Sequence, residues 1–354
     1  MTVNNIKIKN FRNISSLFLK FDKEINVICG ENAQGKTNII EALWLFSGAK
    51  SFRNTADSSF IKFGEKSAKT EVRYILNGIE NNAKIEFNEK RNAFFNDKKL
   101  QSTANLAGKF NAVIFSPSDL NIIVDGPDKR RRFLDISIGQ LYPNYIEILR
   151  SYNRAVQQRN KIIKDYRYDK TVSIMLEIFE QEIVDKGNKI IKYRKNYLNK
   201  LSPYINNIYS GISGGKEEIS SEYTLKNGEE INTKMLENSR EKDMYTASTS
   251  VGPHRDDINF KINGISARSY GSQGQKRSVA LSLKLAGAEV IKEISGEYPI
   301  CLLDDVMSEL DENRQNYILN HIRNWQSFIT CCDVSNIKNL KQGKIIKIKK
   351  GGIV

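Results

Sequence analysis

Apolar and polar residues alternate from Val3 to Phe11, which is the pattern of a strand with one buried face. Glu24 to Cys29 is a short apolar run that predicts a buried strand. It leads through a glycine-rich turn into an apolar-periodic segment that predicts a helix over 37–46. Further strand-like runs occupy 68–76, 83–87, 93–95 and 111–115. The first third of the chain is therefore predicted to be mostly sheet, with one helix after its second strand.

The middle of the chain has a helical pattern instead. Leu, Ile, Tyr and Phe recur at three- and four-residue spacing from Lys129 to about Asn207, which predicts long helices over roughly 130–165 and 170–208. Pro143 is expected to kink the first of these helices or to begin a new one. Two long amphipathic helices joined by a short polar link favour an antiparallel arm.

Strand and helix patterns alternate again after the glycine- and serine-rich break at 211–215. We expect a hairpin turn at Asn263-Gly264, helices at 273–294 and 312–325, and strands at 222–225, 258–262, 299–303, 328–332 and 344–349. Alternating strands and helices at both ends of the chain predict an α/β fold. The helical middle is then an insertion. The predicted domains are a discontinuous one at 1–120 plus 250–354 and an inserted, mostly helical arm or lid at 121–249.

The turn after the second predicted strand has the sequence of a phosphate-binding loop, G-x-x-x-x-G-K-T. In such a loop the backbone N–H groups curl around phosphates, the lysine reaches the β- and γ-phosphates of ATP, and the threonine hydroxyl binds Mg²⁺. The buried strand before it and the helix after it supply the context that the motif requires. The predicted ATP-binding residues here are Gly30, Glu31, Asn32, Ala33, Gln34, Gly35, Lys36, Thr37 and Asn38, and Lys36 is also expected to act in catalysis.

Two adjacent acidic residues, Asp304 and Asp305, follow the apolar run Ile300-Cys301-Leu302-Leu303. Such a pair can simply cap a helix, but the phosphate-binding loop elsewhere in the chain favours a catalytic interpretation. We expect Asp304 to bind Mg²⁺ together with Thr37. We expect Asp305 to orient or deprotonate the water that attacks the γ-phosphate.

The segment SYGSQGQKR at 269–277 offers a second helix N-terminus to a phosphate. Ser272 is a suitable N-cap and Gly274 permits close backbone approach, so a plain helix cap is the simpler alternative. The S-x-G-Q sequence lies about 30 residues before the acidic pair, as the signature motif of ABC ATPases does. By that resemblance Ser272, Gly274 and Gln275 are expected to contact ATP held by a second subunit. The residues 308–311 resemble the D-loop of the same proteins.

The chain of 354 residues has a formal net charge of +14, and residues 126–200 contain 17 Lys and Arg against 9 Asp and Glu. More than half of the excess therefore lies in the helical middle, which suggests a polyanionic partner, either nucleic acid or an anionic membrane surface. No apolar run reaches the ~18 residues of a membrane-spanning helix, and no secretory signal pattern begins the chain, so a cytoplasmic protein is expected. Four cysteines without metal-ligand spacing are expected to be buried free thiols: Cys29, Cys301, Cys331 and Cys332.

Together these motifs resemble the RecF family, bacterial recombination mediators among the SMC-like ABC ATPases. The RRRFLD segment at 130–135 and GPHRDD at 252–257 distinguish the chain from transporters and from long-armed SMC proteins. The resemblance implies an ABC-type P-loop ATPase head, with mixed sheets and flanking helices, that carries the inserted arm. The other matching segments are KNFRN at 9–13, GENAQGKTN at 30–38, FSPSDL at 115–120, QRN at 158–160 and LLDDVMSELD at 302–311.

The same resemblance implies a homodimer that forms on ATP binding and binds double-stranded or gapped DNA. It implies action with RecO and RecR to help load RecA, slow DNA-stimulated hydrolysis of Mg-ATP, and a place in the cytoplasm at the nucleoid. Arg12 and Asn13 are expected to contact nucleotide because related proteins do so at this point. The basic segment suggests DNA contacts for Arg130, Arg131 and Arg132.

Two departures from the wider ABC pattern affect the mechanism. Asp305 stands where those proteins have a glutamate, which places the carboxylate farther from the water and fits slow hydrolysis. No histidine occurs at 329–333, where ABC ATPases have a switch histidine. Thr330 and Asp333 are the alternatives for that role. The competing function is the nucleotide-binding subunit of an ABC transporter, which the basic insertion and the missing histidine disfavour.

Overall fold

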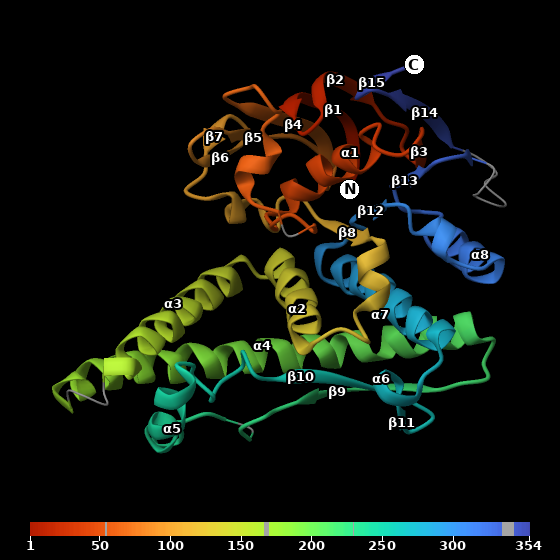
Figure 1. Cartoon of the computed structure of the whole chain (residues 1–354). Helices are drawn as coiled ribbons and strands as arrows, with labels where there is room; N and C mark the ends of the chain where they lie inside the picture. The colour runs from red at the N-terminus through yellow and green to blue at the C-terminus, as the bar shows by residue number, and fades with distance from the viewer. Residues whose placement is uncertain (54, 166–169, 229, 335–342) are drawn as a thin grey trace. The chain divides into compact units, whose positions relative to one another are not determined.

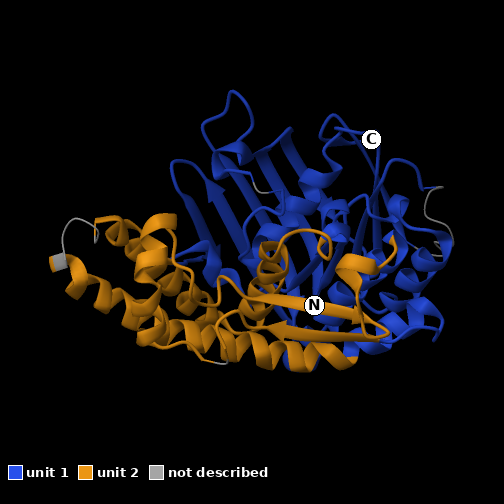
Figure 2. Ribbon diagram, turned by 60° about the horizontal axis from the view of Figure 1, so that its bottom comes forward, with its two compact units in different colours: residues 1–121, 204–218, 273–354 blue, residues 122–203, 219–272 orange. Residues whose placement is uncertain are grey.

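The computed structural model describes all residues except 54, 166–169, 229 and 335–342. It consists of two compact units, and both are discontinuous in sequence (Figure 2). Unit 1 contains Met1–Asn121, Tyr204–Glu218 and Gln273–Val354, and unit 2 contains Ile122–Pro203 and Ile219–Ser272.

Unit 1 has a largely parallel sheet whose strands are ordered β15-β14-β3-β13-β12-β8 (Figure 1). Four of the five pairings among the described strands are parallel, and the pairing of β15 with β14 is antiparallel. Every residue of β8, β12 and β13 is buried, which explains the continuous apolar sequences of β8 and β12. The strands are β3 (Ile25–Cys29), β8 (Ala112–Phe115), β12 (Ile300–Leu303), β13 (Ser327–Cys331), β14 (Lys344–Lys349) and β15 (Gly352–Ile353).

A second, antiparallel sheet of unit 1 has the order β2-β1-β4-β5-β6-β7. Its β1 alternates buried and more exposed residues, as a sheet with one covered face requires. Its strands are β1 (Thr2–Phe11), β2 (Ile14–Lys20), β4 (Ala68–Leu76), β5 (Ile79–Phe87), β6 (Arg91–Phe95) and β7 (Lys98–Lys99). The principal helices of unit 1 are α1 (Lys36–Trp44), α7 (Gln273–Ser295) and α8 (Glu312–His321).

Unit 2 combines helices with a three-stranded antiparallel sheet of order β11-β10-β9. The strands are β9 (Ile219–Thr224), β10 (Asp257–Ile262) and β11 (Ile265–Ser266), and the predicted turn at Asn263-Gly264 connects the last two. The helices are α2 (Pro127–Leu141), α3 (Pro143–Asp165), α5 (Thr233–Thr246), α6 (Ala267–Tyr270) and most of α4 (Ser173–Ser213). The expected pair of long helices is present as α3 and α4 (Figure 1).

Buried arginines hold the helices of unit 2 together. Arg159 of α3 is fully buried and donates hydrogen bonds to Glu180 of α4 (3.0 Å) and to Asp243 of α5 (2.7 Å). Arg194 of α4 donates to both carboxylate oxygens of Asp135 of α2 (2.8 and 3.0 Å). The arginine of the QRN segment thus joins three helices.

Most predicted elements are present, and the differences have local causes. The segment expected to be helical over 130–165 contains two helices, because Pro143 begins α3, which is the second of the two alternatives expected for this residue. The last helix ends at His321, four residues before the predicted end. The sequence pattern missed β2, β7, α5, α6 and β15.

The two units differ from the predicted domain boundaries in two places. The end of α4 lies in unit 1, where the Tyr204 hydroxyl donates to Glu293 of α7 (3.0 Å). Residues 250–272 lie in unit 2, where β10 pairs with β9 along six residue pairs. The contact of the end of α4 with α7 and the pairing of β10 with β9 account for these two differences.

No helix among the described residues has the length and apolar character to cross a membrane. All four cysteines are free, as expected, but their burial differs. Cys301 and Cys331 are buried within strands, Cys29 is half-buried, and Cys332 is exposed. The expectation of a buried thiol is wrong for Cys332, because this residue follows the last residue of β13 and leaves the sheet.

Candidate nucleotide-binding site

The phosphate-binding loop connects β3 to α1, as the sequence predicts. Gly35 has φ of +108°, a left-handed conformation that glycine adopts without a steric penalty. At Gly30 an added Cβ would lie 2.3 Å from the backbone oxygen of Ile348 in the neighbouring strand β14. The two glycines of the motif are therefore required by backbone conformation and by close packing.

Lys36 lies back across the loop that precedes it. Its Nζ donates to the backbone oxygens of Gly30 (2.6 Å) and Glu31 (3.1 Å), and the residue is only 4% exposed. The sulfur of Cys332 also lies 3.5 Å from this Nζ. The ammonium group is thus held inside the loop whose backbone would surround a phosphate.

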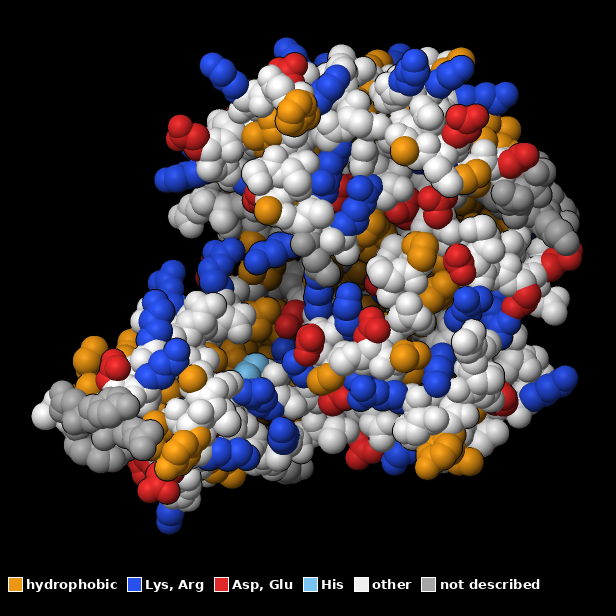
Figure 3. Space-filling view, in the orientation of Figure 1, with side chains coloured by type: hydrophobic (Ala, Val, Ile, Leu, Met, Phe, Trp, Pro, Cys, Tyr) orange, Lys and Arg blue, Asp and Glu red, His pale blue; other side chains and the backbone are white. Residues whose placement is uncertain are grey.

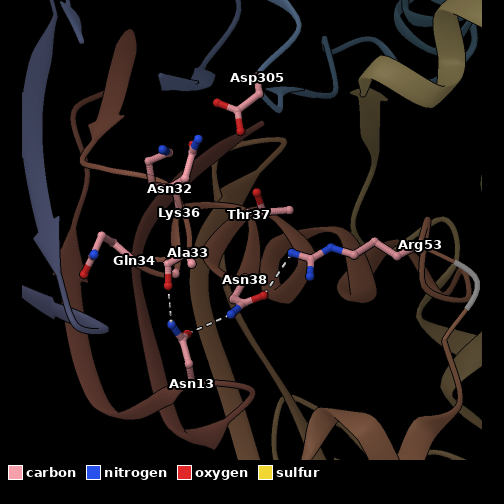
Figure 4. Close-up of a pocket in the computed structure, with 10 residues that line it drawn as sticks. Asn13, Asn32, Ala33, Gln34, Lys36, Thr37, Asn38, Arg53 and Asp305 are labelled. Atoms are coloured by element: carbon pink, nitrogen blue, oxygen red, sulfur yellow. Dashed lines mark hydrogen bonds between the residues drawn. The ribbon is translucent and has the colours of Figure 1, made fainter. Parts of the chain in front are cut away.

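A cavity of about 490 Å³ opens at the loop (Figure 4). This volume falls within the range of about 300–1,000 Å³ that is usual for small-molecule sites. The cavity brings Asp305, which follows β12, together with residues of the phosphate-binding loop. Its lining residues are Asn13, Asn32, Ala33, Gln34, Gly35, Lys36, Thr37, Asn38, Arg53 and Asp305.

Asn13 lies in the cavity wall, but the preceding Arg12 does not. The Asn13 amide donates to the backbone oxygen of Ala33 (3.1 Å) and accepts from the Asn38 amide (2.7 Å), which supports the loop. Arg12 instead makes two 3.0 Å hydrogen bonds to the fully buried carboxylate of Glu41. Because that contact occupies its guanidinium, a nucleotide contact by Arg12 would require a different side-chain position.

Arg53 lines the cavity although no sequence motif indicated it. Its Nη2 donates to the Asn38 side-chain oxygen (2.9 Å), as Figure 4 shows. The residue lies beyond α1, in the segment before β4. A lone arginine in a loop carries no recognisable spacing, so only the folded chain identifies it as a cationic group of the cavity.

The two acids lie at the end of β12, as expected. Asp304 is 5% exposed and accepts hydrogen bonds from the hydroxyl groups of Thr330 (2.9 Å) and Thr37. Burial raises the pKa of Asp304 to about 6, and these hydrogen bonds act in the opposite direction. A hydroxyl oxygen beside a buried carboxylate is the oxygen donor set that Mg²⁺ prefers. The residues present therefore fit the predicted ion.

Asp305 lines the cavity from a left-handed backbone conformation, with φ of +50°. Its carboxylate points toward Asn32, Lys36 and Thr37 in Figure 4. A second cavity of about 230 Å³ adjoins Asp305 and is lined by Asn32, Pro117, Asp305, Met307, Ser308, Glu309, Thr330, Cys331 and Cys332. The predicted D-loop serine thus lies beside the predicted catalytic acid.

The signature-like segment begins α7. The Gln275 side chain donates to Glu217 (2.7 Å), and Glu217 accepts a second hydrogen bond from Tyr209 at the end of α4 (2.6 Å). Ser272 is exposed. Within the described part of the chain, neither Ser272 nor Gly274 nor Gln275 lines the cavity at the phosphate-binding loop.

The three consecutive arginines of α2, which were predicted to contact DNA, are largely engaged by contacts within the protein. Arg130 is 2% exposed, pairs with both carboxylate oxygens of Asp257 (2.7 and 2.9 Å) and donates to three backbone oxygens. It is therefore a structural residue, contrary to the prediction. Arg131 donates to the backbone oxygen of Asp256 (2.7 Å) and to Asp128 (3.0 Å). Arg132 is half-buried and also has a partner.

Comparisons with known proteins agree with this geometry. Residues 2–353 match the family model of the RecF/RecN/SMC N-terminal domain. The chain is 42% identical to the DNA replication and repair protein RecF of Clostridium kluyveri and 39% identical to that of Agathobacter rectalis. Both matches cover 100% of this chain and 99% of the relative.

Solved structures extend the comparison to the fold. The recombination mediator protein RecF-ATP in the RecFOR pathway matches with a TM-score of 0.91 at 37% identity, over 100% of this chain and 97% of that one. An Smc head domain from Pyrococcus furiosus matches with a TM-score of 0.56 at 16% identity, which shows a common fold alone. The phosphate-binding loop, the acid pair and the full-length similarity together show that this chain belongs to the RecF family of the RecF/RecN/SMC proteins.

Proposed function

We propose that this chain is an ATP-dependent DNA-binding mediator of recombination and repair, in which slow ATP hydrolysis acts as a switch. The main observation in support is a single cavity lined both by Lys36 and Thr37, which follow β3, and by Asp305, which follows β12. Relatives at about 40% identity are named DNA replication and repair proteins, and a solved relative is described with ATP. These names support the proposal beyond what the cavity alone indicates.

The cavity residues suit phosphoryl transfer to water. Lys36 would neutralise the β- and γ-phosphates, and Arg53 supplies a further cation in the same wall. Asp305 would orient the attacking water or accept its proton. Thr37 and Asp304 would hold Mg²⁺, which when bound neutralises the charge that develops on the phosphates.

We propose that the complete site forms between two copies of this chain. The residues of the signature-like segment do not line their own chain's cavity, although the start of α7 suits a phosphate. A γ-phosphate that gains contacts only when two chains meet would link dimerisation to nucleotide state. The homodimer is therefore expected to depend on ATP.

For DNA we propose a basic stripe on α3 in place of the three arginines of α2. Arg150, Arg154, Lys161 and Lys164 are all exposed and lie within one face of the helix. Figure 3 shows Lys and Arg side chains gathered over this helix. A row of cations along a helix can follow phosphates without reading bases, so binding to double-stranded or gapped DNA should depend strongly on salt and little on sequence.

Action with RecO and RecR, and indirectly with RecA, belongs to the same proposal, as does a location at the nucleoid. It rests on membership of the RecF family and on the pathway with which a solved relative is described. The alternative of an ABC transporter subunit is not favoured, because the whole length of the chain matches RecF proteins.

A DNA mobility-shift assay with and without ATP, at two salt concentrations, tests the proposal. We expect ATP-dependent binding that weakens steeply with salt. Substitution of Arg150, Arg154 and Lys161 by Ala should weaken binding to all sequences alike. Ala substitutions at Lys66, Lys98 and Lys99, exposed lysines of unit 1, provide the control. Binding that ignores ATP, or that strongly prefers one base sequence, would contradict the proposal.

A further inference from the structure

Asp305 has a backbone conformation that needs external support. Its φ of +50° lies in the left-handed region, which non-glycine residues seldom occupy, although aspartate tolerates it better than most. Such strain persists where neighbouring groups fix it, and it often marks functional positions. The groups that hold this residue in place are therefore of interest.

One hydroxyl group contacts both acidic residues. The Thr330 Oγ1 accepts a hydrogen bond from the backbone N–H of Asp305 (2.8 Å) and donates to the Asp304 carboxylate (2.9 Å). A threonine hydroxyl has one proton and free lone pairs, so it can serve both groups at once. Thr330 is only 1% exposed, which leaves little room for water to replace it.

Strand register explains why this residue reaches both acids. β12 and β13 are parallel, and Leu303 pairs with Ile329. β12 ends at Leu303, while β13 continues to Thr330 and Cys331. Thr330 therefore lies beside the point where the chain leaves β12 as Asp304 and Asp305. On the other side of Asp305, the Ser308 hydroxyl donates to its backbone oxygen (2.9 Å).

We propose that Thr330 is a positioning residue that fixes the Asp304 carboxylate and the Asp305 backbone relative to each other. The hydrogen bond from Thr330 fixes the orientation of the Asp304 carboxylate. The hydrogen bond from the Asp305 N–H to Thr330 stabilises the left-handed backbone conformation that directs the Asp305 carboxylate into the cavity. The inference rests on the proposed ATPase function for its kinetic consequence. Its structural part concerns the protein without nucleotide and stands separately.

An ordinary buried threonine is the competing explanation, and the chain offers a matched control for it. Thr70 in β4 is also fully buried, but its hydroxyl makes no hydrogen bond to any described residue. Thr70→Val therefore tests replacement of a hydroxyl by a methyl group in the core of unit 1 without loss of a hydrogen bond. Thr330→Val makes the same replacement and removes two hydrogen bonds, and Thr330→Ser retains the hydroxyl.

The first measurement is amide hydrogen exchange of the nucleotide-free protein over 304–310. In Thr330→Val the Asp305 N–H has lost its acceptor, so exchange of this segment should be at least about tenfold faster than in wild type. Thr330→Ser and Thr70→Val should match wild type. Unchanged exchange in Thr330→Val would overturn the inference, whether or not the protein hydrolyses ATP.

The second measurement separates ATP binding from turnover. Thr330→Val should bind ATP without Mg²⁺ as wild type does, because Lys36 and the phosphate-binding loop are unaltered. Its kcat should fall at least about tenfold, and half-maximal activity should need more Mg²⁺. Wild-type kcat in Thr330→Val, or equal loss in Thr330→Ser, would overturn the positioning role. A wild-type protein that fails to bind ATP would instead contradict the proposed function.

Discussion

Replacement of the buried arginine of α3 tests how unit 2 is held together. In Arg159→Met the methionine fills part of the volume but removes the ion pair of Asp243, whereas Glu180 keeps its ion pair with Arg240 (2.5 Å). The side chains of Arg159 and Asp243 are 0% exposed and that of Glu180 is 1% exposed, so water cannot solvate the carboxylates that remain. The guanidinium also donates to the Thr249 hydroxyl and to the Leu236 backbone oxygen, both at 3.1 Å.

The expected loss follows from this burial. Removal of one member of a buried ion pair costs about 3–5 kcal/mol, because the other charge stays buried and unpaired. With a urea m-value of about 2–3 kcal/mol/M, the unfolding midpoint should fall by about 1–2 M. The exposed pair of Lys261 and Glu222 in unit 2 provides the control, because Lys261→Met should cost at most about 1 kcal/mol.

Two spectroscopic signals locate the effect. Both tryptophans, Trp44 and Trp325, lie in unit 1, whereas the helices α2, α3 and α5 of unit 2 contribute to the circular dichroism. The dichroism transition of Arg159→Met should therefore shift more than the tryptophan fluorescence transition. Addition of Asp243→Asn should recover part of the loss, since it removes the stranded charge. A midpoint shift no larger than that of Lys261→Met would refute the reasoning.

The remaining predictions concern the site and the pH dependence of stability. Asp305→Asn should keep ATP binding and lower turnover by about 100-fold or more, with a longer-lived dimer in light scattering; unchanged turnover would exclude Asp305 as the catalytic acid. Lys36→Ala and Ser272→Arg should each be inactive, but mixing them should restore part of the ATPase, since one site of the heterodimer is intact. If a pull-down shows that heterodimers form but the mixture has no ATPase activity, one intact site between two chains is not sufficient for turnover. Burial lowers the pKa of His254 to about 4. Its contribution to stability is therefore complete above the unfolded pKa of about 6.5 and is lost as the pH falls toward 4. Wild type should lose about 2 kcal/mol more than His254→Gln between pH 7 and pH 5 in urea titrations, and equal losses would contradict this.

The local motifs could be located from the sequence because their function depends on consecutive residues. A phosphate-binding loop uses backbone groups of one short segment between a strand and a helix, so its sequence and its local structure coincide. The acid pair is equally local, since a buried apolar strand ends where two carboxylates begin. Both segments occur in the structure where they were expected, at the ends of β3 and β12.

Single charged residues were harder to assign, because burial and partners depend on distant parts of the chain. Three consecutive arginines form a basic patch in the sequence, yet Arg130 is buried against Asp257, a residue of β10. Arg53 lines the cavity without any motif, and Arg12 contacts the buried Glu41. Composition revealed the positive charge of the segment but not which guanidinium groups face solvent.

The sequence by itself determined most of the order of strands and helices, the phosphate-binding loop and the acidic pair, because these depend on periodicity and on neighbouring residues. Only the tertiary structure decided which of these segments meet. The parallel register of β12 and β13 places Thr330 against both acids, and the spacing of these residues along the sequence does not predict that contact. Strand pairing and register depend on residues that are far apart in the sequence, so the hydrogen bonds that orient the site form only in the folded chain.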